Sequence, residues 1–288
     1  MRILIFSKNR AAQLDMLLRS IKAQVTRSEA LSISVVYHYD NAEFHQGYLK
    51  IQAKHPDIHY HLQQGGSLKN QLLELIDRET KQFFSFFVDD LVVIRPFSIT
   101  DHEFSTLATR PDIAALSLRL NPAVNFSQPL NLQTRPPRLS SDNTWAWNVR
   151  ASHLSRLWTR PVLGDWSLAL NLDGNVYRYD DIKAYFRTLP EIPHVTALEG
   201  IMSTRPLPGK RILCYPHSRI INLAMNRVDA HSVFPCGDES AVEFNERFLK
   251  GEVLSFEHLM SLANRACHII TKPEWVFDSS AGRRKGTS

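Results

Sequence analysis

Short apolar segments alternate with helical segments through the first ninety residues, and this alternation constrains the fold more than any other feature of the chain. Residues 3–6 form a continuous apolar run, after which leucine and isoleucine recur at helical spacing through residues 11–24. The pattern then continues with candidate strands at residues 31–37, 58–62 and 83–88, and with candidate helices at residues 48–54 and from Ser67. Alternation of this kind predicts an α/β fold, with a mostly parallel sheet flanked by helices.

The rhythm changes after residue 120, where the chain becomes rich in proline and polar residues. Residues 121–143, 163–179 and 189–208 are predicted to be irregular. Between and after them we predict strands at residues 145–149, 212–215 and 220–223, and helices at residues 151–157, 180–186, 242–250 and 256–270. We therefore expect one subdomain at residues 1–120, a second at residues 121–278 and a disordered tail at residues 279–288.

Composition limits the class of protein. The chain has 288 residues, 43% of them hydrophobic, which suffices for a sizeable core and argues against general disorder. The net charge of +5 suits anionic ligands, yet the sequence carries no RNA-recognition or zinc-finger signature, so no nucleic-acid partner is expected. The apolar run at the N-terminus is too short for a signal peptide, and the three cysteines, Cys214, Cys236 and Cys267, form no Cys-x-x-Cys pair. A reducing, cytoplasmic location fits these features.

Two adjacent carboxylates, Asp89 and Asp90, follow the most apolar strand candidate of the chain. In open α/β sheets, ligands bind beyond the carboxyl ends of the strands. Two negative charges at such a position are costly unless a cation or hydrogen-bond donors satisfy them. Mg²⁺ and Mn²⁺ prefer carboxylate and phosphate oxygens, so a divalent ion between Asp90 and a diphosphate is the predicted solution. The alternative is that the pair simply begins a solvated turn.

The other strand ends point to the same edge of the sheet. Residues 7–10 follow the first strand and Asp40 follows the second, and Lys8 or Arg10 can hold phosphate oxygens there. Gly65 and Gly66 precede a helix, but the chain has neither the Gly-x-x-x-x-Gly-Lys-Ser/Thr loop nor the Gly-x-Gly-x-x-Gly fingerprint. A P-loop nucleotidase and a standard NAD enzyme are thereby disfavoured.

Taken together, residues 3–10, 36–41, 69–70 and 86–90 resemble the nucleotide-sugar-binding half of GT-A glycosyltransferases, which have a Rossmann-like α/β fold. The resemblance covers about residues 1–96. It implies a nucleoside-diphosphate sugar donor, with a uridine-linked donor expected, and Mn²⁺ or Mg²⁺ as cofactor. Leu91 stands where the family's acidic motif often has a third acidic residue, so the resemblance leaves open which carboxylate contacts the metal.

The resemblance also implies roles for individual residues. It assigns the metal to Asp90, with Asp89 beside it. It assigns contacts with the nucleotide sugar to Ser7, Lys8, Asn9, Arg10, Asp40, Lys69, Asn70 and Asp89. The second half resembles the acceptor side of bacterial glycosyltransferases less specifically, through Trp145, Trp147 and the segments around residues 165, 173 and 199. The implied acceptor is a glycan or a lipid-linked molecule.

An inverting transferase needs a carboxylate base near the acceptor hydroxyl, and the candidates are Glu199, Asp173 and Asp165. Glu199 fits best by resemblance, in what is expected to be a proline-rich loop, although a surface role is as plausible for each of the three taken singly. His217 and His268 are weaker candidates for the metal shell. Inversion and retention both stay open.

Three other functions remain open. A sugar-phosphate nucleotidyltransferase would share the core and the metal, but its glycine-rich loop after the first strand is missing. A phosphatase with an aspartate nucleophile needs Asp-x-Asp at the strand end, where this chain has Leu91. A binding module would keep the nucleotide pocket without chemistry. The basic residues 283–285 are expected to give at most a weak peripheral contact with acidic lipids, since each cation contributes only about 1 kcal/mol.

Overall fold

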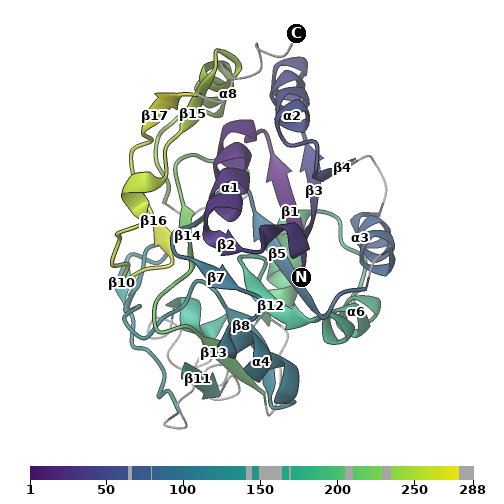
Figure 1. The fold of residues 1–288 in the computed structure, drawn as a ribbon, viewed down its shortest axis with the longest axis vertical. Helices are drawn as coiled ribbons and strands as arrows, with labels where there is room; N and C mark the ends of the chain where they lie inside the picture. Colours follow the sequence, from purple (N-terminus) through teal and green to yellow (C-terminus); the bar gives the residue numbers. More distant parts are fainter. Residues whose placement is uncertain are drawn as a thin grey trace.

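A single large sheet organises the structure, which is a computed structural model that describes residues 1–63, 67–78, 80–140, 145–148, 164–168, 170–204, 210–228 and 235–278. The sheet has eight strands in the order β11-β13-β8-β12-β5-β1-β3-β4 (Figure 1). These strands are β1 (Arg2–Lys8), β3 (Ser32–His38), β4 (His59–Leu62), β5 (Phe83–Val88), β8 (Ile113–Ser117), β11 (Trp145–Asn148), β12 (Asn175–Arg178) and β13 (Arg211–Cys214).

Six of these strands run in one direction, and only β11 and β12 run against it. β1 pairs in parallel with both β3 and β5, so that Phe6 lies beside Val36 on one side and Val88 on the other. β12 is antiparallel to both of its neighbours, β5 and β8. The predicted α/β class with a mostly parallel sheet is confirmed. The sheet draws strands from both expected subdomains, and the boundary at residue 120 stays a prediction.

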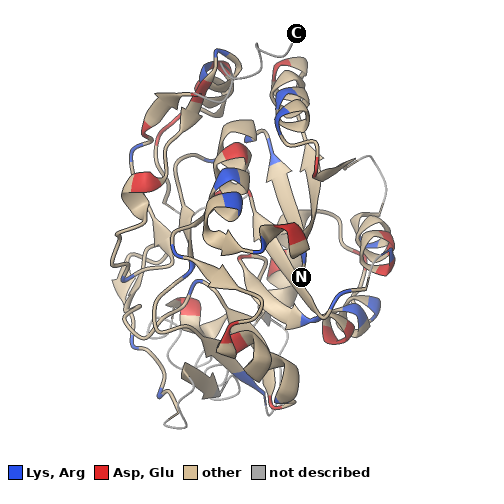
Figure 2. Cartoon of the chain, viewed as in Figure 1, with Lys and Arg blue, Asp and Glu red and all other residues tan. Residues whose placement is uncertain are grey.

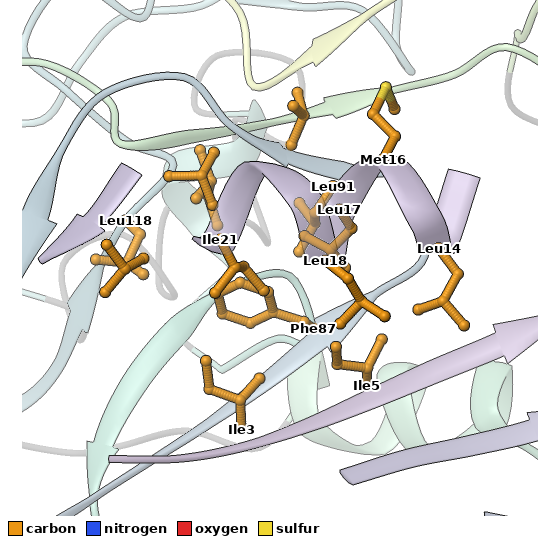
Figure 3. Close-up of a cluster of buried hydrophobic side chains, with 14 of the residues drawn as sticks. Ile3, Ile5, Leu14, Met16, Leu17, Leu18, Ile21, Phe87, Leu91 and Leu118 are labelled. Atoms are coloured by element: carbon orange, nitrogen blue, oxygen red, sulfur yellow. The ribbon is translucent and has the colours of Figure 1, made fainter. Parts of the chain in front are cut away.

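Helices cover both faces of the sheet. The helices in the described part of the chain are α1 (Ala11–Gln24), α2 (Ala42–Lys54), α3 (Leu68–Asp77), α4 (His102–Thr109), α6 (Tyr179–Arg187), α7 (Val195–Thr204) and α8 (Ala241–Leu249), of which α8 packs on α1, α2 and β15. Successive residues of β1 face opposite sides, as the two-residue period of a strand requires. Ile3 and Ile5 pack with α1 and Phe87 in one core (Figure 3). Leu4 and Phe6 belong to a second core, to which α3, α6 and α7 contribute.

Side-chain caps fix where several helices begin. The Asn41 side chain accepts a hydrogen bond of 2.9 Å from the Phe44 N–H, and Ser67 accepts one of 3.1 Å from the Asn70 N–H. Such caps satisfy backbone donors that lack a partner within the helix. The Asn41 cap explains why α2 begins at Ala42 and not at residue 48, where the apolar pattern placed its start.

Smaller sheets surround the main one. The largest has three strands, β6 (Leu91–Val93), β14 (Ile220–Leu223) and β16 (His268–Ile269), with β14 in the middle. The described residues also form three two-stranded pairs: β2 (Val25–Thr26) with β7 (Phe97–Ser98), β9 (Phe126–Ser127) with β10 (Leu132–Gln133), and β15 (Glu252–Leu254) with β17 (Trp275–Phe277). The 3₁₀ turns are η1 (Ser28–Ala30), η2 (Gly164–Ser167) and η3 (Glu257–Leu259).

Three predictions for the second half of the chain are wrong. Residues 163–179, expected to be irregular, contain the strand β12. The helix expected at residues 256–270 is replaced by η3 and β16, because His268 pairs with Asn222 of β14 and the sheet overrides the local pattern. The proline-rich stretch 189–208, expected to be irregular, contains the helix α7. The predicted helix at residues 151–157 lies outside the described residues.

A buried ion cluster joins α1 to the end of α2. The Asp15 carboxylate has no exposed surface, and it lies 2.7 Å from Arg19 Nε, 2.9 Å from Lys54 Nζ and 3.0 Å from His55 Nε2. Lys54 Nζ also lies 2.7 Å from Asp278, just after β17. The cluster therefore connects the N-terminal helices to the last described residue of the chain.

Charged residues of both signs are interspersed on the helices that cover the sheet, as on α1, α2 and α6 (Figure 2). Such an arrangement is typical of a solvated surface. Within the part of the chain that the structure describes, none of the helices has the length and apolar character needed to cross a membrane.

Candidate functional site

The carboxyl ends of β1 and β3 are joined by polar side chains. Asn9 Nδ2 donates to Asp40 Oδ2 over 2.7 Å, and the Asp40 N–H donates back to Asn9 Oδ1 over 3.0 Å. Asn9 has a φ of 54°, in the left-handed region that asparagine tolerates better than most residues. Lys8 Nζ lies 3.1 Å from Asp40 Oδ1. The loop after β1 is thus fixed to the loop after β3.

The carboxyl end of β5 adds the aspartate pair to the same edge. Asp89 Oδ2 accepts a hydrogen bond of 3.1 Å from the Lys8 backbone N–H. Arg10 Nη1 lies 3.1 Å from Asp89 Oδ1 and 3.4 Å from Asp90 Oδ2, so one nitrogen contacts both carboxylates. Three strand ends therefore place Lys8, Asn9, Arg10, Asp40 and the pair in one connected cluster, which we call the strand-end cluster.

The two aspartates differ in environment. The Asp89 side chain is 5% exposed, whereas that of Asp90 is 20% exposed. Burial raises the pKa of Asp89 to about 6, and the Asp90 charge acts in the same direction, while Arg10 opposes both. Asp90 is consequently the member of the pair with access to a ligand, and Asp89 is the member held inside the protein.

The raised pKa of Asp89 makes a prediction about stability. Since the folded protein holds this proton up to about pH 6 and the unfolded chain releases it near 3.8, stability from this group is lost as pH rises between these values. Asp89→Asn removes this titration. The free energy of unfolding of the variant, relative to that of the wild type, should therefore be higher at pH 8 than at pH 5 by roughly 1–3 kcal/mol. Urea denaturation of both proteins at the two pH values measures it. An unchanged difference between variant and wild type would contradict the raised pKa.

Asn222 connects the strand-end cluster to the second half of the chain. Its Nδ2 donates to Asp90 Oδ1 over 3.1 Å, and its Oδ1 accepts from Arg119 Nη1 over 2.8 Å. The Leu223 N–H also donates to the Asp90 carbonyl over 2.8 Å, which fixes β14 beside the pair. One oxygen of Asp90 is therefore held by Asn222, and the other faces Arg10.

Arg119 is the centre of a second cluster, buried to 1% exposure. Its Nη1 lies 3.1 Å from Asp173 Oδ2 and its Nη2 lies 3.8 Å from Asp165 Oδ1. Its Nη1 also contacts His268 Nε2 at 3.3 Å. Burial alone would lower the pKa of Arg119, but Asp173, Asp165 and Glu199 together raise it above its ordinary value. All three carboxylates expected on the acceptor side therefore act on this arginine.

Asp173 reaches the ligand-binding edge because β12 runs antiparallel to β5. The start of an antiparallel strand lies at the edge where its parallel neighbours end. Gly174 makes the turn with a φ of +76°, and its N–H donates to the Phe86 carbonyl over 2.8 Å. A Cβ at this position would lie 2.0 Å from Ile220 Cδ1, so a larger residue would be strained at this φ and would also displace Ile220. The glycine thereby positions the aspartate that precedes it.

Other predicted residues lie in different settings. Glu199 is half-buried on α7, and the expected loop position is wrong because the chain is helical there. Lys69 Nζ donates to the backbone carbonyl of Leu189, and Asn70 is exposed in the first turn of α3. Ser7 is buried, with its hydroxyl 2.7 Å from the Tyr48 hydroxyl. The nucleotide contacts predicted for Lys69, Asn70 and Ser7 remain predictions.

The donor atoms of the strand-end cluster suit a divalent cation at one carboxylate. Each oxygen of Asp89 and of Asp90 already accepts one hydrogen bond, but the Asp89 side chain is buried whereas that of Asp90 is partly exposed. Among the described residues, no group of three His, Cys, Asp or Glu side chains is placed to hold a metal. Mg²⁺ is commonly bound through one or two carboxylates together with substrate phosphates and water, and Asp90 fits that mode.

Three residues that belong to these clusters or contact them were not predicted from the sequence. Arg119 stands between Leu118 and Leu120 at the end of a buried strand, and an isolated arginine in such an apolar run signals a buried ion pair. Asn222 and Asn226 give no comparable signal. Asn226 accepts from Arg10 Nε over 2.9 Å, a contact across 216 positions of the sequence.

The chain is only distantly similar to known proteins. No family model matches the chain, and no curated protein matches it either. Among solved structures it is similar to S. aureus TarS, with a TM-score of 0.48, 12% identity, and coverage of 74% of this chain and 34% of TarS. It is also similar to TarS 1-349 in complex with UDP-GlcNAc, with a TM-score of 0.43, 13% identity, and coverage of 75% and 56%.

A third similar structure is the mannosyltransferase PcManGT from Pyrobaculum calidifontis in complex with GDP-Man and Mn²⁺. The TM-score is 0.30 at 17% identity, over 46% of this chain and 42% of that one. The chain thus spans less than two thirds of the length of each of these proteins. At this level of likeness, its function has to be inferred from its own residues.

Proposed function

We propose that this protein is a glycosyltransferase that uses a nucleoside-diphosphate sugar as donor. The observation that carries the proposal is the strand-end cluster, in which the ends of β1, β3 and β5 bring two basic side chains and three carboxylates together. Ligands of open α/β sheets bind at this edge. A diphosphate needs cations and N–H donors, and a ribose needs hydrogen-bond acceptors, and the cluster offers both.

The donor is held by residues with distinct tasks. Lys8 and Arg10 bind the diphosphate oxygens, and Asp40 accepts hydrogen bonds from the ribose or base. Asp90 holds Mn²⁺ or Mg²⁺, and Asp89 keeps Lys8 and Arg10 in place. When bound, the cation neutralises negative charge that develops on the departing diphosphate. We propose that the donor is a uridine-linked sugar.

The acceptor, a glycan or a lipid-linked molecule, binds beside Arg119. Within the described part of the chain, Arg119 Nε and Asp165 Oδ2 are buried and have no hydrogen-bond partner, and an acceptor hydroxyl is a group that can satisfy such atoms. Asp165 and Asp173 are themselves buried, and each pairs with the Arg119 guanidinium. Glu199 is half-buried and on a neighbouring helix, and we assign it the role of base for an inverting reaction.

Asp90→Asn tests the donor site, because the amide keeps the side-chain shape and removes the charge. We expect UDP to bind the wild type in the presence of Mn²⁺, and to bind the variant at least ~10-fold more weakly, a loss of about 1.4 kcal/mol. Calorimetric titration of UDP with Mn²⁺ and with EDTA measures both affinities. Asp77→Asn is the matched control, since that aspartate is exposed and pairs with Lys183 on the surface.

The same titrations can overturn the proposal. If the wild type binds none of UDP, GDP, CMP and dTDP, the nucleotide-sugar premise fails. If nucleotide binds but Asp90→Asn retains full affinity in Mn²⁺, the role of Asp90 fails while the donor class survives. Transfer to candidate acceptors is then assayed as release of nucleoside diphosphate, with Glu199→Gln expected to bind donor normally and to lose turnover.

A further inference from the structure

We infer that Arg10 is an internal counter-ion of the aspartate pair, which competes with a divalent cation for Asp90 and is released when a diphosphate binds. The inference rests on the proposed function, which supplies the diphosphate. It concerns how cation and nucleotide depend on one another, and it assigns that dependence to one side chain.

Arg10 occupies the position between the two carboxylates. Its Nη1 lies 3.1 Å from Asp89 Oδ1 and 3.4 Å from Asp90 Oδ2, and the side chain is only 13% exposed. Asn222 holds the other oxygen of Asp90, so Oδ2 is the atom that a cation would share with Arg10. Mg²⁺ lies about 2.0–2.1 Å from its oxygen ligands in proteins, so a divalent cation on Oδ2 would lie close to Nη1. Two cations at such separations repel each other, so the two contacts exclude one another.

The rest of the guanidinium is anchored elsewhere. Arg10 Nε donates to Asn226 Oδ1 over 2.9 Å, and Nη2 donates to the Asn226 backbone carbonyl. The contact of Nη1 with Asp90 is longer than its contact with Asp89, and it is the contact that must be given up. The bonds of Arg10 to Asn226 and Asp89 do not involve Asp90, so giving up this one contact need not break them.

A diphosphate offers Arg10 a better partner than a shared carboxylate. The planar guanidinium matches phosphate oxygens in pairs, and such charge-assisted bonds are among the stronger ones in proteins. Once Arg10 turns to the diphosphate, Asp90 is open to the cation. By linkage, cation and nucleotide must then raise one another's affinity by the same factor. We expect this factor to be about 10 or more, and the cation alone to bind weakly.

The test measures Mn²⁺ binding at pH 8 by electron paramagnetic resonance of the free ion, without and with saturating UDP. For the wild type we expect weak binding of Mn²⁺ alone and at least ~10-fold tighter binding with UDP. Arg10→Met should bind Mn²⁺ alone several-fold more tightly than the wild type, and its coupling to UDP should fall towards one. Arg78→Met removes the same charge from an exposed residue at the C-cap of α3 and should behave as the wild type.

The possible results of this test distinguish failure of the inference from failure of the proposed function. If Arg10→Met binds Mn²⁺ alone no more tightly than the wild type, or keeps the full coupling, the inference is overturned while the proposed function stands. If no protein binds UDP but Arg10→Met still binds Mn²⁺ more tightly, the proposed function fails and the counter-ion role survives. Should Arg10→Met fail to fold in a thermal melt, Arg10→Lys replaces it. Lysine cannot bridge the pair in the same way, so a smaller change in the same direction is expected, and no change overturns the inference.

Discussion

Replacing Arg119 with methionine should lower the free energy of unfolding by about 3–5 kcal/mol, the usual cost of removing one partner from a buried ion cluster. The guanidinium is 1% exposed and compensates two aspartates, Asp173 and Asp165, that are themselves buried. Methionine fills a similar volume but leaves both carboxylates without their cation. Because natural domains are stable by only about 5–15 kcal/mol, this loss is a large fraction of the total.

Urea denaturation measures the effect, with Arg187→Met as the matched control. Arg187 is 59% exposed and pairs with Asp77 on the surface, so its loss should cost no more than about 1 kcal/mol. The double variant Arg119→Met/Asp173→Asn should be less destabilised than the sum of the two single changes, because the second change removes one of the orphaned charges. Strict additivity, or a cost of Arg119→Met no larger than that of the control, would show that the cluster does not stabilise the fold.

Asp15→Asn should destabilise the protein by a similar amount, roughly 3–5 kcal/mol. The carboxylate has no exposed surface and contacts Arg19, Lys54 and His55, which would be left facing a neutral amide. Burial alone would raise the pKa of Asp15, yet the His55 contact, Arg19 and Lys54 together lower it well below its ordinary value. A lowered pKa contributes stability above the pKa of the unfolded chain, near 4, and that contribution is lost as pH falls below it.

The difference in unfolding free energy between wild type and Asp15→Asn should therefore be constant above about pH 5 and should shrink towards pH 2–3. Denaturant titrations across this range measure it. Asp57→Asn is the control. Asp57, like Asp15, pairs with a basic residue of α1, in its case Lys22, but its side chain is 59% exposed. Equal effects of the two substitutions at pH 7 would contradict a special role for the buried carboxylate.

The N-terminal half of the fold was predictable because its signals are local. The apolar runs at β1, β3 and β5 and the leucine spacing of α1 each identify an element without reference to the rest of the chain. β12 was missed because it is four residues long within a polar stretch, and it is a strand only because β5 and β8 lie on either side of it. Tertiary pairing, and not local pattern, decides such elements.

The candidate site, like the fold, could be predicted only in part from the sequence. Strand ends in a βαβ series meet at one edge, so the contact of Lys8 and Arg10 with Asp89 follows from topology. The hydrogen bonds that link Asp90 to Asn222 and Asn222 to Arg119 each join residues more than a hundred positions apart. No spacing pattern in the sequence predicts them. The prolines that flank Glu199 predict a loop, whereas the chain between them forms the helix α7.

The position of β12 between β5 and β8 has a consequence for how the chain is made. During synthesis, β5 leaves the ribosome roughly 90 residues before its neighbour β12, a delay of about 5–20 s at ordinary translation rates. Throughout that time one edge of β5 has free backbone donors and acceptors, in a segment that reads Phe-Phe-Ser-Phe-Phe-Val. The nascent chain therefore passes through a stage at which an aggregation-prone strand waits for a partner not yet synthesised, and chaperones that shield such edges should matter more for its yield than its final stability suggests.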